Sequence, residues 1–306
     1  MSLKLIRPVE ITDAVLTASN VAESETAWSA ATTYSMGQTC YEVVAGVHQK
    51  FTSKQNTNLN HQPSLDTTAT WWQANGPTNR WAMFDGAYQT QTTRADEVAV
   101  TLALPSDERM NVLWIGNLAG VEASVTITDA TEGVIHDETY SLVSVSGIND
   151  EYDWAFEPIE RVRELTLEDL PGGYTGVTVD VSVTAAGETA AVGALVVGFA
   201  KVLGDTRWGG SISIRDYSVK EEDAFGNLVV VERAYRKTAT LSAILRNDAM
   251  ANVVNNLTDY RARPALWIGS ASYAPFVIWG FVKDWNVEAS LPPSRSLLSM
   301  NLEGLT

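Results

Sequence analysis

The sequence predicts a mainly β protein, and three observations support this. Apolar residues alternate with polar or small ones along several short stretches, most clearly over residues 177–183 (Val-Thr-Val-Asp-Val-Ser-Val). Strict alternation is typical of strands that bury one face. Turn-forming residues such as 171–173 (Pro-Gly-Gly) separate these stretches, and one segment alone has a helical pattern. We expect a β-sandwich or jelly roll, a C-terminal β-domain with one packed helix and a long hairpin, and a small inserted aromatic-rich β module.

Length and composition limit the classes of protein to consider. A chain of 306 residues is long enough for two or three domains. Ten Trp and 45% hydrophobic residues supply real cores and argue against wholesale disorder. The net charge of −16 argues against nucleic acid and anionic membrane surfaces as partners. Cys40 is the single cysteine, which points to folding in a reducing compartment, and we expect neither a signal peptide nor membrane insertion.

Residues 26–76 have more aromatic surface than so short a segment usually needs. They begin at Trp28, continue through Tyr34-x-x-Gly37 and close on the pair Trp71-Trp72. This spacing resembles small chitin- and cellulose-binding modules. The resemblance implies a small β module, inserted after an N-terminal arm at residues 1–25 that joins the main body.

Flat aromatic side chains in this module are candidates for stacking on sugar rings, whose C–H face is apolar. The four residues predicted to contact carbohydrate are Trp71, Trp72, Tyr41 and Phe51. Adjacent residues of an extended chain point to opposite faces, so we expect at most one of the two tryptophans to be exposed. The alternative is that these aromatics fill the core of a domain too small to bury much else.

The sandwich is expected over residues 77–203. Short alternating stretches such as 98–102 and 125–127 are separated by turns. The apolar run 194–199 is typical of a fully buried strand and ends this part.

The start of this region, Trp81-Ala-Met-Phe-Asp85 followed by Thr90-x-Thr92, resembles galactose-binding-like jelly rolls, and residues 112–118 continue the pattern. The resemblance implies a jelly-roll fold in a family that often binds sugars through loops at one end and sometimes holds calcium. No loop residue of this chain can be named as a ligand, so a jelly-roll spacer stays the alternative.

Residues 204–306 are expected to form the C-terminal β-domain. An alternating strand at 211–217, a turn at 223–227 and a return to Tyr235 predict a long hairpin. The predicted helix spans 248–263, with Asn247 as its N-cap, one apolar face and Pro264 beyond its end. Further strands are expected at residues 238–245, 266–269, 276–282 and 297–304.

Four segments resemble the tail-tip (distal tail or baseplate) proteins of long-tailed bacteriophages, and together they cover nearly the whole chain. They are residues 7–13 (Arg-Pro-Val-Glu-Ile-Thr-Asp), 76–81 (Gly-Pro-Thr-Asn-Arg-Trp), 216–235 with its Phe-Gly-Asn turn, and 279–284 (Trp-Gly-Phe-Val-Lys-Asp). The resemblance implies a structural virion protein, made in the cytoplasm of the host bacterium and located at the tail tip. Its implied partners are copies of itself in a 3-fold or 6-fold ring, the tail tube, the baseplate hub and, through the inserted module, host-surface polysaccharide.

Long hairpins can join the sheets of neighbouring subunits, so the hairpin is the candidate contact between copies. The residues predicted to make it are Tyr217, Lys220, Glu221, Phe225, Glu232 and Arg233. The alternative for such a run of charges is a solvated face.

Nothing in the sequence predicts catalysis, and we expect no enzyme activity, no cofactor and no metal site. The three histidines lie far apart, and no nucleotide-binding or nucleophile motif is present. Acidic clusters at residues 150–153 and 157–160 are the loosest candidates for a glycosidase-like carboxylate pair. Asp129 with Glu132, and Asp223 with Asn227, are explained by turn formation rather than calcium binding. A free carbohydrate-binding protein and a tail-associated polysaccharide depolymerase stay open as alternatives.

Overall fold

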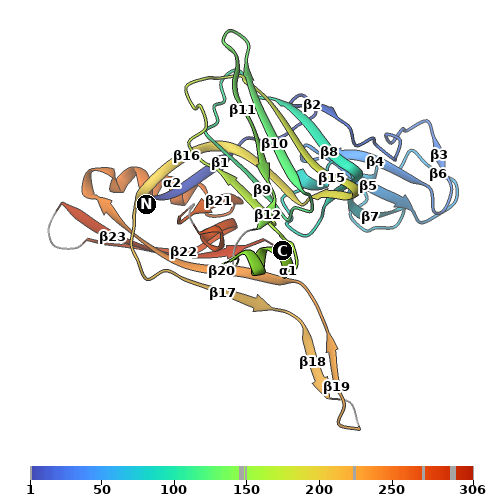
Figure 1. Cartoon of the computed structure of the whole chain (residues 1–306). Coiled ribbons are helices and arrows are strands. Elements are labelled where there is room, and N and C mark those ends of the chain that lie inside the picture. Colours follow the sequence, from blue (N-terminus) through green and yellow to red (C-terminus); the bar gives the residue numbers. More distant parts are fainter. Residues whose placement is uncertain are drawn as a thin grey trace.

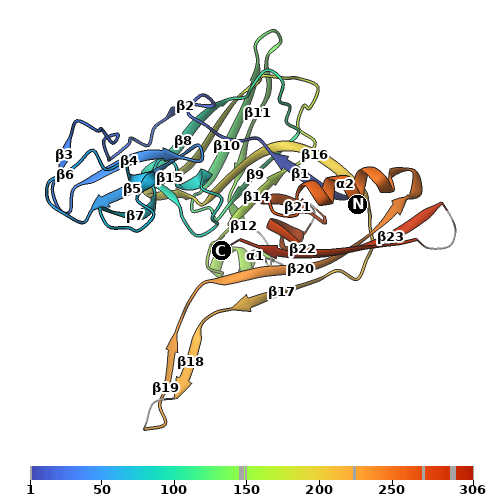
Figure 2. The ribbon, with the colours of Figure 1, turned by 180° about the vertical axis from the view of Figure 1, so that it is seen from behind.

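The computed structural model describes residues 2–144, 148, 150–222, 225–270, 273–289 and 294–305. The protein is mainly β, as the alternation predicts. Figures 1 and 2 show a barrel that includes the C-terminal strands and, on the opposite side of a central sandwich, the small inserted module. A two-stranded hairpin extends away from all three parts.

One large sheet runs through both the barrel and the sandwich. Its strands, in spatial order, are β14 (Glu164–Leu167), β9 (Val112–Gly116), β16 (Ala194–Thr206), β1 (Ser2–Pro8), β21 (Ala265–Ile268), β22 (Val277–Ala289), β23 (Arg295–Gly304), β20 (Tyr235–Arg246) and β17 (Ser211–Asp216). A further pairing of β16 with β20, at Asp205–Ile244 and Thr206–Ala243, closes the strands from β16 to β20 into a barrel.

Helix α2 (Met250–Asp259) follows a short 3-10 turn, η3 (Asn247–Ala249), and packs Val253 and Leu257 against the core of the barrel. The predicted apolar face is therefore confirmed, but the predicted bounds of 248–263 are too long. The N-cap of α2 is Ala249, whose methyl group cannot accept a hydrogen bond, and the Asn247 side chain accepts one from Ser296 Oγ. The assignment of Asn247 as the N-cap was therefore wrong.

The sandwich is completed by a second sheet. Its strands, in spatial order, are β11 (Gly133–Ser141), β10 (Glu122–Asp129), β15 (Thr178–Val192), β8 (Thr92–Ala103) and β2 (Leu16–Ser19). Strand β9 is buried on both faces, because Leu113 and Ile115 face the sandwich core while Val112 and Trp114 join the cluster that contains Trp279. The alternation of side chains thus packs β9 against both parts.

This arrangement bears on two predicted boundaries. Strand β16 runs without a break across residues 203 and 204, where the sequence suggested a division between domains. The segment expected as an arm that joins the main body, residues 1–25, contributes strands to it, since β1 lies inside the large sheet and β2 forms an edge of the second sheet. Strands β1 and β16 bury apolar residues on both sides, so the barrel and sandwich share a sheet instead of being joined by a linker.

The inserted module agrees with the expected range of 26–76, except that its last strand ends at Pro77. Its elements are β3 (Thr33–Tyr34), β4 (Thr39–Val44), β5 (Val47–Ser53), β6 (Asn58–Leu59), η1 (Pro63–Leu65) and β7 (Trp72–Pro77). They form a three-stranded sheet of β4, β5 and β7 and a pairing of β3 with β6, around a core of their own.

The long hairpin is present as expected. Strand β17 pairs with β20, and the ribbon continues as the isolated pair β18 (Val219–Glu222) and β19 (Leu228–Val231), which Figures 1 and 2 show extending from the barrel. The remaining elements are η2 (Ala82–Phe84), η4 (Ala274–Phe276), the pair β12 (Val143–Ser144) and β13 (Glu160–Arg161), and the short helix α1 (Glu151–Phe156).

Helix α1 was not predicted. Its signal is local: Asp150 accepts hydrogen bonds from the backbone N–H groups of Tyr152 and Asp153, which makes it an N-cap. The helix buries no residue, so it has no apolar period that the sequence could reveal.

Candidate functional site

Two surfaces carry the residues that the sequence singled out, the inserted module and the projecting hairpin. In Figures 1 and 2 they lie apart, the module beyond the sandwich and the hairpin beyond the barrel. The structure therefore does not bring the two predicted sets of residues together.

The core of the module holds two of the four predicted sugar-contacting residues. Trp72 and Phe51 are buried with Tyr34 and Cys40. The ring of Trp72 meets Tyr34 edge-on, with centroids 5.0 Å apart, and its Nε1–H donates to the backbone oxygen of His61 at 2.7 Å. Neither Trp72 nor Phe51 offers a ring face to a ligand, so their assignment as stacking residues was wrong. For these two, the core-filling alternative is correct.

Trp71 is held at the surface of the module by the turn that precedes it. Asp66 Oδ2 accepts from the backbone N–H groups of Trp71 and Trp72, at 2.7 and 2.8 Å, and Oδ1 accepts from Thr70 N at 3.1 Å. Desolvation tends to raise the pKa of Asp66, but these N–H groups, that of Trp72 first, outweigh it and lower the pKa of the carboxyl. The ionised carboxylate thus fixes the backbone on which Trp71 sits.

The indole of Trp71 is half-buried and stacks on the imidazole of His61, with centroids 3.7 Å apart and planes 12° from parallel. His61 Nδ1 lies 3.1 Å from Oδ1 of the buried Asn58, which fixes the imidazole in turn. Of the two adjacent tryptophans only Trp71 reaches the surface, which confirms that at most one would be exposed.

Tyr41, the fourth predicted sugar-contacting residue, belongs to a stack that joins the module to the sandwich. Its ring lies 4.4 Å from His48 and 7° from parallel, and His48 lies 4.6 Å from Trp81, which is buried in the sandwich core. One face of Tyr41 is therefore covered by His48. The stack of Tyr41, His48 and Trp81 attaches the module to the sandwich. The sequence did not indicate this role of His48.

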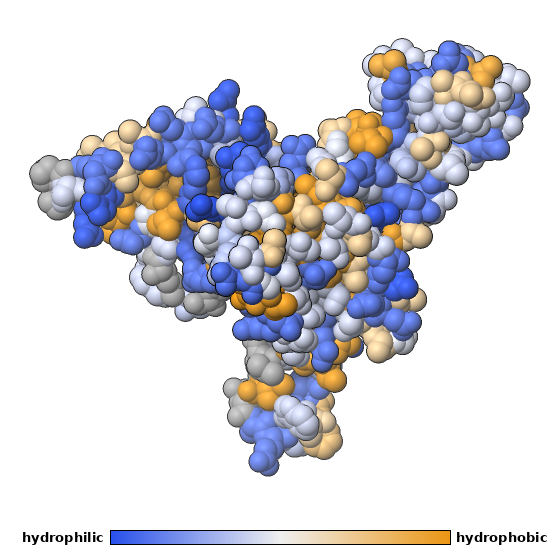
Figure 3. Space-filling model, turned by 90° about the horizontal axis from the view of Figure 1, so that it is seen from above, coloured by the Kyte–Doolittle hydropathy of each residue, from blue (hydrophilic) through white to orange (hydrophobic). Residues whose placement is uncertain are grey.

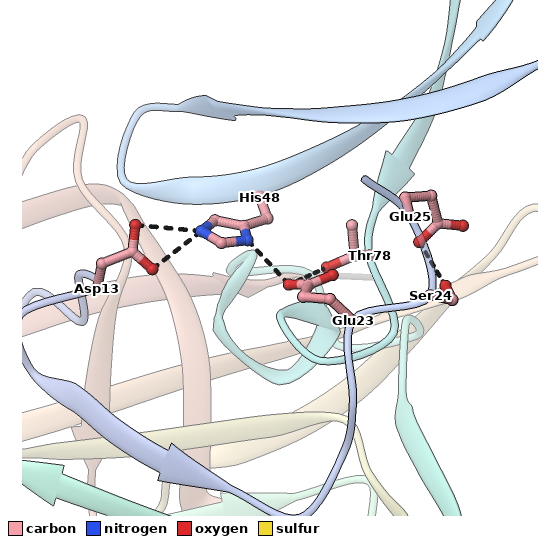
Figure 4. Close-up of polar contacts among 6 residues, drawn as sticks. All are labelled: Asp13, Glu23, Ser24, Glu25, His48 and Thr78. Atoms are coloured by element: carbon pink, nitrogen blue, oxygen red, sulfur yellow. Dashed lines mark hydrogen bonds and ion pairs between the residues drawn. The ribbon is translucent and has the colours of Figure 1, made fainter. Parts of the chain in front are cut away.

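Both nitrogens of the His48 ring face carboxylates from the N-terminal segment (Figure 4). Nδ1 lies 2.8 Å from Glu23 Oε1, and Nε2 lies 2.9 and 3.1 Å from the two oxygens of Asp13. The side chain of His48 is nearly buried, so these contacts form a polar joint between the module and the rest of the chain.

Neighbouring contacts reinforce this joint. The hydroxyl of Thr78 donates to Glu23, and the backbone N–H of Thr78 donates to the backbone oxygen of His48 at 2.8 Å. Glu25 is nearly buried and pairs with Lys50 and Ser24. Desolvation opposes ionisation of Glu25, but these partners, Lys50 first, outweigh it and lower the pKa of the carboxyl.

The base of the projecting hairpin is stabilised by charges within the chain. The ring of Tyr217 lies 5.4 Å from the guanidinium carbon of Arg215 and 5.7 Å from that of Arg236. Lys220 pairs with Asp216 at 3.1 Å. Hydrogen bonds from the side chain and backbone of Ser218, together with Lys220, lower the pKa of Asp216 to about 2. Two of the six predicted contact residues, Tyr217 and Lys220, are thus engaged within their own chain.

The outer part of the hairpin presents the other four, Glu221, Phe225, Glu232 and Arg233, to solvent. Phe225 is 91% exposed. The sequence did not single out strand β19, although all four of its residues, Leu-Val-Val-Val, are exposed. Elsewhere, on the face seen in Figure 3, hydrophobic residues form separate patches among hydrophilic ones.

Other exposed aromatic residues were also missed. Trp154 on α1 is 75% exposed, and Trp208 and Tyr273 flank a pocket beside the start of β17. Trp208 precedes Gly209-Gly210 and lies outside any alternating stretch, which is the one signal that separates it from a core residue.

The described residues contain no group of three His, Cys, Asp or Glu side chains arranged to hold a metal ion. Asp129 Oδ2 accepts from the backbone N–H groups of Thr131 and Glu132, which accounts for it as a turn residue. Asp223, of the second pair, lies outside the described residues. Asp150 is accounted for as the N-cap of α1.

Within the described part of the chain, none of the helices has the length and apolar character needed to cross a membrane. Neither a scan of the sequence against protein-family models nor a search of curated proteins gives a match.

Proposed function

We propose that this chain is a structural subunit of the tail tip of a long-tailed bacteriophage, where copies of it form a ring at the end of the tail tube. The observation that carries the proposal is the outer hairpin: among the described residues β18 and β19 pair only with each other, and β19 exposes four apolar residues in a row. An isolated two-stranded hairpin is marginally stable in water. Exposed edges of this kind are templates for pairing with another chain.

A ring is the assembly that such a hairpin favours. When a projecting element of one copy contacts a different surface of the next, the interface is heterologous, and heterologous contacts close into rings if the rotation allows it. The 3-fold or 6-fold order follows from the resemblance to tail-tip proteins. The net charge of −16 fits a ring through which DNA passes, because like charges suppress adhesion.

The test is the mass of the purified chain by light scattering across a concentration range, with negative-stain images of the same samples. We expect closed rings of a single size. A matched variant, with residues 219–231 replaced by a short Gly-Asn turn, removes the outer hairpin and leaves the pairing of β17 with β20 intact; we expect it to be a monomer. A wild-type chain that stays a monomer at all concentrations contradicts the ring.

We further propose that the inserted module contacts host-surface glycans through Trp71. The supporting observation is the rigid presentation of this indole, whose backbone is held by Asp66 and whose ring is stacked on His61. Rigid aromatic side chains lose little conformational entropy on binding. Trp71→Ala is expected to reduce retention on host polysaccharide roughly tenfold, whereas Trp154→Ala, an exposed tryptophan outside the module, is the control and should not.

The same polysaccharide distinguishes the alternative functions. Release of reducing ends by the wild-type chain would identify a depolymerase instead. Retention on polysaccharide by a chain that never assembles would favour a free carbohydrate-binding protein. Equal retention of the Trp71 variant and the wild type contradicts the stacking role.

A further inference from the structure

A pocket of about 330 Å³ lies where β16 leads into β17. Its walls are aromatic and apolar, formed by Trp208, Leu241, Tyr273 and Phe276. Trp208 meets Tyr273 edge-on, with ring centroids 6.4 Å apart, and Tyr273 meets Phe276 in the same way at 6.5 Å. The pocket is at the small end of the range for ligand sites, about 300–1,000 Å³, and suits one or two side chains.

Glycines keep this pocket open. A Cβ at Gly210 would lie 3.1 Å from the ring of Phe276, and one at Gly269 would lie 3.0 Å from Leu241. The hydroxyl of Thr206 donates to the backbone oxygen of Gly269 at 2.7 Å and fixes the two sides of the pocket relative to each other. Trp208 at its rim is 79% exposed, so the pocket's own chain leaves most of this indole in water.

The complementary feature lies at the far end of the same ribbon. Strand β17 begins directly after Gly210, and the chain continues through β18 to Phe225, which is 91% exposed, and then to Leu228, which is 66% exposed. Phe225 is 15 positions beyond Gly210 (225 − 210), an extended length of at most about 50 Å. Figures 1 and 2 show this ribbon running away from the barrel without folding back. Phe225 therefore lies far from the pocket of its own chain.

We propose that Phe225 and Leu228 of one copy insert into the Trp208–Tyr273 pocket of a second copy. The proposal rests on self-assembly as the proposed function and names the two surfaces that meet. Because the inserting residues and the pocket are at opposite ends of one ribbon, every copy offers both, and the contact repeats from head to tail.

Charge favours a second copy as the occupant. The outer hairpin carries exposed carboxylates at Glu221, Glu222 and Glu232, which outnumber its exposed cations, Arg233 and the Lys220 that pairs with Asp216. The pocket has the exposed guanidinium of Arg207 in its lining. In a chain with a net charge of −16, a cation beside an aromatic pocket is matched to an acidic hairpin with an aromatic tip.

Two variants separate the halves of the contact. Phe225→Ser with Leu228→Ser removes the inserting residues, and Trp208→Ala opens the pocket wall. All three residues are well exposed, so these changes are not expected to unfold the chain. Buried aromatic anchors are typical hot spots, so each variant should weaken self-association by roughly 30-fold or more. Trp154→Ala, which removes an equally exposed tryptophan on α1, is the control and should assemble as the wild type does.

Mixing the two variants gives the decisive measurement. The hairpin variant retains its pocket and the Trp208 variant retains its hairpin, so an equimolar mixture should form dimers that cannot grow. Light scattering should show monomers for each variant alone and twice the monomer mass for the mixture. A mixture that stays monomeric, or variants that assemble like the wild type, overturns the proposal.

Cysteine cross-linking locates the contact directly in the full-length chain. Cys40 is the one native cysteine and is buried, and burial, followed by the charge of Glu42, raises the pKa of its thiol to about 12. Asn227→Cys combined with Arg207→Cys keeps the inserting residues and the aromatic pocket walls, and should therefore give intermolecular disulfides between the hairpin of one copy and the pocket of the next. Rings that form without this cross-link overturn the inference and leave the ring intact. A cross-link in open chains supports the inference and contradicts the ring. If Trp208→Ala assembles normally but loses retention on polysaccharide, the pocket binds sugar and the inference is wrong.

Discussion

The inserted module and the outer hairpin are both rich in apolar residues, but they use them in opposite ways. The module turns Trp72, Phe51 and Tyr34 inward to a small core of its own. Strand β19 of the hairpin, by contrast, exposes its whole Leu-Val-Val-Val sequence. This contrast shows that aromatic or apolar content does not by itself distinguish an exposed surface from a core. The distinction is whether the residues pack within their own chain, as those of the module core do, or stay exposed, as those of β19 do.

The largest effect should come from breaking the core of the module. Trp72→Ala removes a buried indole and its hydrogen bond to His61, and such truncations cost about 3–5 kcal/mol. We expect residues 26–76 to lose protection in hydrogen-exchange mass spectrometry while the barrel keeps it. Trp71→Ala, one residue away and half-buried, is the matched control and should preserve protection of the module. Equal loss of hydrogen-exchange protection in the two variants would mean that the two tryptophans contribute equally to the stability of the module.

The joint between module and sandwich should be the next most sensitive. Removing one partner of a buried hydrogen bond costs about 1–3 kcal/mol. Because the side chain of Asp13 is 61% exposed and screened by water, we expect His48→Gln to cost about 2 kcal/mol. The variant should make the linkage between residues 77 and 81 more susceptible to limited proteolysis, with the module itself still folded. An unchanged cleavage pattern would show that the ring stack alone holds the module.

The turn before Trp71 should give a smaller, pH-dependent effect. The pKa of Asp66 is lowered in the folded module, so its stabilisation is complete above about pH 5 and is lost as the pH falls through the lowered pKa. Asp66→Asn should reduce the free energy of unfolding of the module by about 1 kcal/mol at neutral pH and remove this part of the acid dependence. Asp129→Asn changes a similar turn carboxylate in the sandwich, and hydrogen exchange in the module should not respond to it.

The smallest effect on stability is expected in the hairpin. Val230→Thr should change the free energy of unfolding of the dilute chain, measured in urea, by no more than about 0.5 kcal/mol, because the residue is exposed. The same substitution at Val181, in the sandwich core, should cost about 1–3 kcal/mol because it buries a hydroxyl. Comparable losses at the two positions would show that the hairpin packs on its own chain and would remove the contrast with the module.

Local patterns in the sequence predicted local structure well. The alternation over residues 177–183 coincides with the start of β15 from Thr178 onward, where Val179, Val181 and Val183 are buried. The apolar face of α2 and the projecting hairpin were also predictable, since each depends on residues close together in the chain. Period 2 required Trp71 and Trp72 to differ in exposure, but the one that is buried depends on His61 and Tyr34, which no pattern identifies.

Long-range pairing could not be predicted in the same way. Nothing in residues 2–8 indicates that they pair with both β16 and β21, and this pairing fuses the barrel to the sandwich. The pocket beside β17 was missed for the same reason, because Trp208 and Tyr273 are 65 positions apart in sequence (273 − 208). The His48 joint likewise brings Asp13 and Glu23 of the N-terminal segment together with Trp81.

The position of β1 has a consequence for synthesis on the ribosome. Leu5 pairs with Trp267, which is translated 262 residues later (267 − 5). At a translation rate of about 5–20 residues per second, roughly 13–52 s pass between them. During that interval β21, which pairs with β1 in the barrel, has not been synthesised. Leu3, Leu5 and Ile6 therefore lack part of their final packing. The module, whose hairpin of β4 and β5 is complete within a few residues, can fold on the emerging chain long before the barrel closes.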